Sequence, residues 1–128
     1  MPLTRLDHVN VRTANLAAMT AWYEDVLGMI SGPRPDFAFP GAWLYVGDTA
    51  AVHLVGVQEP TAADATQIEH FAFSATGMRD LMERLDAKRV PYTLDPVPGF
   101  PVVQINLHDF DGNHIHIDFA AEEAEGLV

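Results

Sequence analysis

Two histidines alternate near the carboxyl end of the chain, in the stretch DFDGNHIHIDF, residues 109–119. In a β-strand, side chains two positions apart point to the same face of the sheet. His114, His116 and Asp118 therefore share one face of a predicted strand, and apolar residues form the other face. A face that carries imidazole groups either contacts water or surrounds a group that imidazole binds, such as a transition metal.

The elements that would position these histidines occur twice along the chain. Leu6-Asp7-His8 superposes on Ile68-Glu69-His70 at an offset of 62 positions, and each triplet reads apolar, acidic, His. In each half a short strand precedes apolar residues at helical spacing, which predicts helices over about 16–27 and 78–85. Thr13 or Asn15 is the expected cap of the first helix, and Ser74 or Thr76 that of the second.

Each predicted helix is followed by a pair of strand-like stretches. In the first half these are 42–48 and 50–57, and in the second half 102–109 and 113–119. The Asp111-Gly112 dipeptide between the latter two is a typical hairpin turn. An offset of 63 places His53 on His116. A repeat of this length indicates two copies of one supersecondary unit, joined by a linker over 58–66.

Four of the six histidines thus fall at equivalent positions of the repeat: His8 with His70, and His53 with His116. A single strand histidine is usually a partly buried, hydrogen-bonded residue. Four in register favour a shared metal site near a pseudo-two-fold axis. His108 and His114 have no repeat partner. We expect His108 to be solvated and His114 to lie at the mouth of the strand.

Composition limits the possible functions. The chain has 128 residues, 18 acidic against seven basic side chains, a net charge of -11 and no cysteine. The negative charge argues against binding to nucleic acid or anionic membranes. Without thiolates, a transition metal would need His, Asp or Glu. The start of the chain lacks the features of a signal peptide and no apolar run is long enough for a membrane span, so we expect a cytoplasmic protein.

The chain resembles the vicinal oxygen chelate superfamily, which includes glyoxalase I, extradiol dioxygenases, and fosfomycin and bleomycin resistance proteins. The resemblance rests on four stretches in this order: LDHVNVRT, AWYEDVLGM, IEHFAFS and HDFDGNHIHI. It covers nearly the whole chain. It implies an α+β fold of two βαβββ modules that form curved, incompletely closed mixed sheets. We expect one glyoxalase-like domain over 1–128, with module one at 1–59 and module two at 66–120.

The resemblance also implies a site. Family metal ligands lie on the first and last strands of each module, which correspond here to His8, His53, His70 and His116. These would hold one divalent transition metal per site, such as Zn, Fe or Ni, for which imidazole is a suitable ligand. In small members the site often forms between two chains, so we expect a homodimer with shared sites and a small-molecule substrate.

The sequence departs from the family pattern at the last strand, where the usual Glu is His116. Four neutral imidazoles leave the full charge of the metal, and they remove the ligand carboxylate that serves as base in glyoxalase-type proton transfer. His53 is the expected weakest ligand, because its family position varies most. Glu69, which neighbours His70, is expected to point away from it.

Three further residues are candidates for the site. Asp118 is a possible catalytic base, an orienting partner of a ligand imidazole, or a solvated carboxylate at a strand end. Arg34, in the Pro- and Phe-rich loop 31–43, either binds an anionic substrate group or lies in solvent. Gln104 alternates with Val103 and Ile105, so it is a candidate for substrate binding.

The sequence leaves more than one class of function open. The first is a metal-dependent enzyme, a dioxygenase, lyase or isomerase, whose substrate chelates the metal through oxygen atoms. The alternative is a non-catalytic binding protein of the antibiotic-resistance type. The four retained histidines argue against it, whereas the net charge of -11 would suit the binding of a cationic drug. A metal-bound but catalytically silent protein is a third reading. The missing ligand carboxylate argues against the glyoxalase reaction.

Overall fold

The computed structural model describes residues 5–60 and 68–127. The chain divides into two compact units, Met1–Thr66 and Gln67–Val128. Most of the expected linker, from residue 61 onward, lies outside the described residues. Each unit has the same order of elements, strand, helix and three strands, as the repeat and the resemblance predict.

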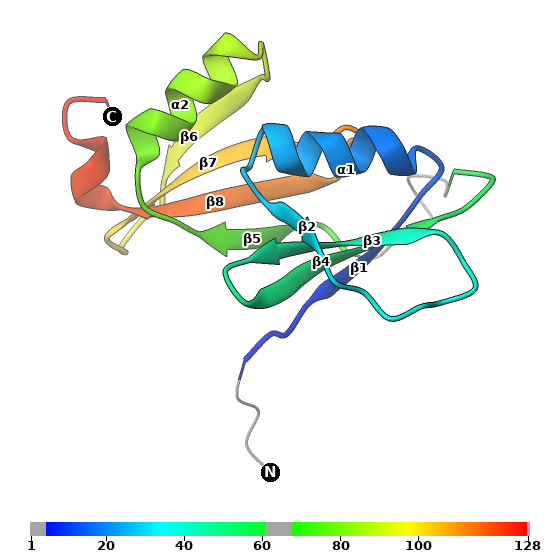
Figure 1. Ribbon diagram of the computed structural model, residues 1–128. Coiled ribbons are helices and arrows are strands. Elements are labelled where there is room, and N and C mark those ends of the chain that lie inside the picture. The colour runs from blue at the N-terminus through cyan, green and yellow to red at the C-terminus, as the bar shows by residue number, and fades with distance from the viewer. Residues whose placement is uncertain (1–4, 61–67, 128) are drawn as a thin grey trace. The chain divides into compact units, whose positions relative to one another are not determined.

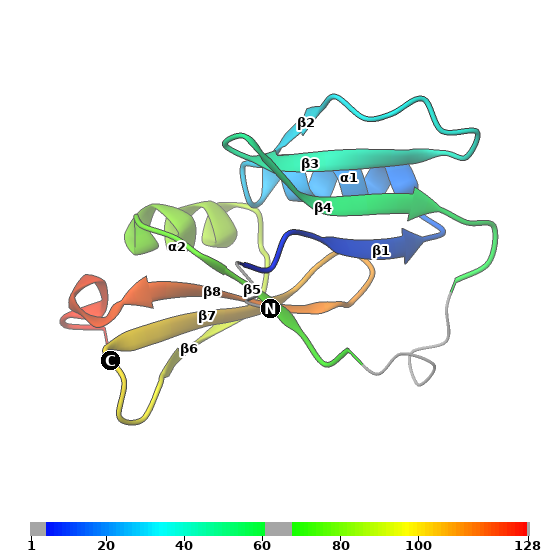
Figure 2. The ribbon, with the colours of Figure 1, turned by 90° about the horizontal axis from the view of Figure 1, so that it is seen from below.

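The first unit forms a four-stranded mixed sheet with one helix (Figure 1). Its elements are β1 (Val9–Thr13), α1 (Leu16–Asp25), β2 (Ile30–Gly32), β3 (Gly41–Val46) and β4 (Thr49–Gly56). The strand order is β1-β4-β3-β2, with β1 parallel to β4 and the other pairs antiparallel. Figure 2 shows these four strands side by side. The sheet is open, because β1 and β2 remain as edges.

The second unit repeats this topology. Its elements are β5 (Phe71–Ser74), α2 (Met78–Ala87), β6 (Tyr92–Pro96), β7 (Val102–His108), β8 (His114–Ala120) and the short 3₁₀ helix η2 (Ala121–Ala124). The strand order is β5-β8-β7-β6, and β5 pairs with β8 in parallel. The prediction of two βαβββ modules with open mixed sheets is confirmed. The residue pattern by itself did not indicate strands β2 and β6.

Alternation along the central strands separates an apolar face from a polar one. On β7 and β8 the buried apolar residues are Val103, Ile105, Leu107, Ile115, Ile117 and Phe119. Of the residues between them, Gln104, Asn106 and Asp118 are half-buried and His116 is buried. Because strand side chains alternate, the burial of one set leaves the other set on the opposite face, available for polar chemistry.

Helix α1 packs against β3 and β4 of its own unit through Met19 and Tyr23, which are fully buried. Asn15 is its N-cap residue, one of the two that the sequence offered. Gly28 follows the helix with a φ of 71°, in the left-handed region that glycine adopts without strain. The turn then directs the chain into β2.

The start of helix α2 differs from the sequence prediction. Neither Ser74 nor Thr76 caps it, because the N-cap is Gly77. The Glu123 carboxylate, far along the chain, accepts hydrogen bonds of 2.9 Å from the backbone N–H groups of both Gly77 and Met78. A carboxylate at this end also interacts favourably with the helix dipole. The cap therefore comes from tertiary structure, which sequence spacing does not reveal.

The hairpin between β7 and β8 is organised by Asp109, which is 5% exposed. Its Oδ1 accepts hydrogen bonds from the backbone N–H groups of Asp111 and Asn113, and its Oδ2 accepts one from the Asn113 side chain. Gly112 has a φ of 87°. This turn sets the register that pairs His108 with His114.

Among the described residues, no helix is long and apolar enough to cross a membrane, since α1 and α2 each span ten residues.

Candidate metal centre

His8 and His53 contact each other in the first unit. His8 directly precedes β1, and His53 on β4 pairs with Asn10 of β1. The two rings stack with centroids 3.9 Å apart and planes 12° from parallel. Trp43 on β3 stacks on the His53 ring at 4.0 Å. Imidazole lone pairs lie in the ring plane, so stacked parallel rings do not direct theirs to one point. In this arrangement the two rings do not converge on one ion, so His53 would join His8 as a ligand only after its ring rotates out of the stack.

The two histidines of this pair differ in their hydrogen bonds. The Asp7 carboxylate accepts a 2.8 Å bond from Nδ1 of His8, and this bond lowers the pKa of Asp7. His53 instead donates from Nε2 to the backbone carbonyl of Ala50 at 3.0 Å. Burial, with the neighbouring His8, lowers the pKa of His53, which favours its neutral form. His8 therefore presents Nε2, and His53 presents Nδ1.

His70 and His116 contact each other in the second unit. His70 directly precedes β5, and His116 lies on β8 opposite Ala72 of β5. Their ring centroids are 4.6 Å apart and their planes are tilted by 45°. The side chain of His70 is 39% exposed and that of His116 is 10% exposed. In each unit the histidine before the first strand thus neighbours the histidine on the last strand, because these two strands pair in parallel.

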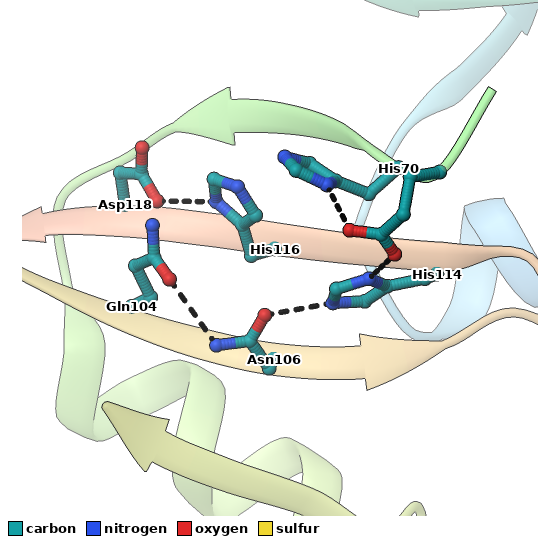
Figure 3. A network of polar contacts seen from close by, with 7 residues as sticks. His70, Gln104, Asn106, His114, His116 and Asp118 are labelled. Carbon is teal, nitrogen blue, oxygen red and sulfur yellow. Dashed lines mark hydrogen bonds and ion pairs between the residues drawn. The ribbon is translucent and has the colours of Figure 1, made fainter.

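Asp118 accepts a 2.6 Å hydrogen bond from Nδ1 of His116, as Figure 3 shows. The Asp118 side chain is 30% exposed and lies against the ring, so it is not a fully solvated carboxylate, and its role as orienting partner or base stays a prediction. This contact leaves Nε2 of His116 as the nitrogen available to a ligand.

Glu69 does not point away from His70, contrary to the expectation. Its Oε1 lies 2.7 Å from Nδ1 of His70, and its Oε2 lies 2.8 Å from Nδ1 of His114. Hydrogen bonds from His114 and then from His70 lower the pKa of Glu69. The expectation failed because β5 begins at Phe71, so strand alternation does not apply at Glu69.

Nε2 of His114 completes a chain of polar contacts across the sheet (Figure 3). It donates to Oδ1 of Asn106 at 2.8 Å, and Nδ2 of Asn106 donates to Asp95 at 2.9 Å. His108 is exposed, as expected, and stacks on His114 with centroids 5.4 Å apart. His114 therefore belongs to the polar face that carries His70 and His116.

Three of the four candidate ligands share one arrangement, a carboxylate on Nδ1. The pairs are Asp7–His8, Glu69–His70 and Asp118–His116. Histidines that bind metals typically donate their other ring N–H to such a partner, which fixes the tautomer and the ring orientation. These residues therefore fit a metal site. The repeated acidic-His dipeptides at 7–8 and 69–70 were the sequence signal for two of the pairs.

Arg34 and Gln104 occupy different environments. Nη2 of Arg34 donates to the carbonyl of Phe39 at 2.9 Å, and the guanidinium lies over the rings of Phe37 and Phe39 at 5.0 and 5.2 Å. These contacts hold its own loop together. Gln104 lies on the polar face of the second sheet, where its Oε1 accepts a 3.3 Å bond from Asn106. A substrate role for either residue stays a prediction.

A single metal ion bound by all four histidines would need ligands from both units, and this stays a prediction. Within single units the structure brings together His8 with His53, and His70 with His114 and His116. Glu69, His70 and His114 offer ligand atoms that all lie within 4.8 Å of one another.

Comparison with known proteins gives consistent matches. The family model of the Glyoxalase/Bleomycin resistance protein/Dioxygenase superfamily matches residues 5–117. Glyoxylase I 4 of Arabidopsis thaliana is 32% identical over 123 residues, which cover 90% of this chain and 70% of that protein. A manganese-dependent 2,3-dihydroxybiphenyl 1,2-dioxygenase of Geobacillus genomosp. 3 is 32% identical over 88 residues, 66% of this chain and 27% of the dioxygenase.

Solved structures show the same fold. A putative glyoxalase family protein from Bacillus anthracis superposes with a TM-score of 0.78 at 22% identity, covering 94% of this chain and 98% of that one. A lactoylglutathione lyase from Agrobacterium tumefaciens superposes with a TM-score of 0.73 at 18% identity, covering 95% and 98%.

Proposed function

Because the chain belongs to the Glyoxalase/Bleomycin resistance protein/Dioxygenase superfamily, we propose that it is a metal-dependent enzyme acting on a small molecule. The substrate chelates the metal through oxygen atoms, and the reaction is that of a dioxygenase, lyase or isomerase. We further propose that residues 1–128 act as one domain, in the cytoplasm, and that the metal is held by His8, His70 and His116 with His53 as a variable fourth ligand. Manganese, named in one relative, joins Zn, Fe and Ni as a candidate.

The observation that carries this proposal is the set of carboxylate–histidine pairs. Each of the three principal ligands in the proposal has a carboxylate 2.6–2.8 Å from its Nδ1. Such a partner raises the basicity of the ring and directs Nε2 to a ligand. Two of the pairs, Asp7–His8 and Glu69–His70, lie at equivalent positions of the two modules. A single carboxylate–histidine contact is common on protein surfaces. The same contact at equivalent positions of both modules indicates a shared role in binding a metal.

The carboxylates change the charge expected at the site. Four imidazoles alone would leave the full charge of a divalent metal, whereas Asp7, Glu69 and Asp118 each add a negative charge one hydrogen bond away. A bound metal would supply Lewis acidity toward the substrate oxygens. The protein residues would orient the rings, and Asp118, half-buried beside His116, is the carboxylate best placed to accept a proton from the substrate. Gln104 on the same face would orient a substrate oxygen.

Metal analysis and turnover assays test the proposal. Protein without a His tag should contain one transition metal ion per chain, and it should turn over catechols in air or hemithioacetals. His70→Ala should lose the metal and the activity, while His108→Ala, which removes an exposed histidine near the same face, should keep both. Equal metal content in the two variants would refute the ligand assignment. Tight small-molecule binding without metal or turnover would instead establish the binding-protein alternative.

A further inference from the structure

The second unit contains a cluster of three possible metal ligands, only one of which belongs to the proposed catalytic centre. Glu69, His70 and His114 surround one point on the polar face of the sheet, next to the start of β5 and the start of β8. Of these residues only His70 belongs to the centre proposed above. Glu69 and His70 are exposed and His114 is half-buried, so an ion would reach them from solvent.

The contacts of His114 fix which of its ring nitrogens faces Glu69 and His70. The Asn106 amide has a fixed orientation, because its Nδ2 donates to Oδ2 of Asp95, which also accepts a bond from Thr93. Its Oδ1 therefore faces His114 and accepts from Nε2–H at 2.8 Å. In a neutral imidazole the other nitrogen then carries a lone pair.

That lone pair faces a carboxylate. Nδ1 of His114 lies 2.8 Å from Oε2 of Glu69, which is a contact between two acceptors unless a cation lies between them. The cation is either a second proton on the ring or a metal ion. Nδ1 of His70 lies 2.7 Å from the other oxygen of the same carboxylate, so a third donor atom is already in place.

We propose that Glu69, His70 and His114 form a second binding site for one divalent transition metal, contained entirely in the second unit. Two imidazoles and one carboxylate are a ligand set that suits Zn and Fe(II), with positions left open to water. Ligands at about 2.0–2.2 Å from one ion lie within roughly 4.4 Å of each other. The three ligand atoms lie within 4.8 Å, so small side-chain rotations complete the site.

The two sites compete for His70. Its Nδ1 faces Glu69, and its Nε2 is the nitrogen assigned to the catalytic centre. A neutral imidazole has one lone pair, so it ligates through one nitrogen at a time. An ion held by Glu69 and His114 would therefore exchange with the centre that includes His116, whose ring centroid lies 4.6 Å from that of His70. Asn106 acts as a positioning residue, because it fixes which nitrogen His114 presents.

The experiment uses the full chain with His8→Gln and His116→Gln together, which removes two principal ligands of the catalytic centre. Zn²⁺ affinity is measured by competition with a chromophoric chelator. This background should still bind one Zn²⁺ per chain. Adding Asn106→Leu, which removes the hydrogen-bond partner of His114, should weaken Zn²⁺ binding roughly 10–100-fold. Adding His114→Gln instead removes the ligand itself and should weaken binding by more than that. The matched control, His108→Gln, should leave it unchanged.

No residual binding in the background, or residual binding that His114→Gln leaves unchanged, would overturn the inference and assign a proton to the contact. If the background variant does not fold, ¹⁵N NMR of the wild-type histidine rings provides the test. Zn²⁺ should shift the Nδ1 resonance of His114, and an unchanged resonance would also overturn the inference. Failure of the proposed function is recognised separately, as absent turnover in wild-type protein loaded with metal.

Discussion

The Asp118 carboxylate lies 2.6 Å from Nδ1 of His116, two residues away on the same strand. Side chains at this spacing share a face, so the strand itself holds the pair together. The pair fixes the tautomer of His116 and presents its Nε2. His116 is the most buried candidate ligand, with a side chain 10% exposed, so both its surroundings and this contact hold the ring.

Asp118→Ala should lower metal affinity by roughly 10–100-fold, because the His116 ring loses the partner that orients it. Chelator competition measures the effect. Glu83→Ala removes an exposed carboxylate from α2 and should leave affinity unchanged. Equal affinities for the two variants would mean that the Asp118 contact plays no part in metal binding.

His116→Glu should restore the ligand carboxylate that related sequences usually carry at this position. The structure adds a condition, because the new carboxylate would lie beside Asp118 and the two negative charges would repel. We therefore expect His116→Glu with Asp118→Asn to bind metal better than His116→Glu alone. Hemithioacetal turnover should rise in the double variant relative to wild type. High turnover in wild type would show that the chain already has an effective base.

The stability of the metal-free protein should depend on His53 near neutral pH. Burial lowers the pKa of His53 in the folded state, so the unfolded chain binds a proton more readily. The free energy of unfolding should consequently fall as the pH drops below the unfolded value of about 6.5. Urea denaturation of wild type and His53→Gln at several pH values measures this. The variant should show a shallower decrease, and identical slopes would contradict the assignment.

Glu123→Ala should destabilise the fold by about 0.5–2 kcal/mol, the usual cost of losing a helix N-cap. The carboxylate is the acceptor for the backbone N–H groups of Gly77 and Met78, and both bonds are lost together. Denaturant unfolding measures the change. Glu122→Ala, at an exposed neighbouring position, should stay within about 0.5 kcal/mol of wild type.

A homodimer with sites shared between chains is the expected assembly. One half of each site, His8 with His53, would then come from a different chain than His70 with His116. Sedimentation should show a dimer, and mixing His8→Gln chains with His70→Gln chains should restore metal binding at one of the two sites. A monomer that binds metal normally would exclude the shared arrangement.

The sequence alone determined the repeat and the shared face of His114, His116 and Asp118 on the last strand. Strand alternation placed His116 with Asp118, and the offset between the halves matched His8 to His70 and His53 to His116. Within each unit, the parallel pairing of the first and last strands then brought one histidine of each equivalent pair together, His8 with His53 and His70 with His116. Strand period and internal repetition are properties of the residue order, so a single sequence reveals them.

Only the tertiary structure decided the contacts that leave the strand pattern. Glu69 turns toward His70 and His114 because it precedes β5, and its nearest partner on β8 is 45 residues away. Glu123 caps α2 across a similar separation. Side chains outside regular elements have no period to follow, and their direction depends on which groups the fold brings within hydrogen-bonding distance.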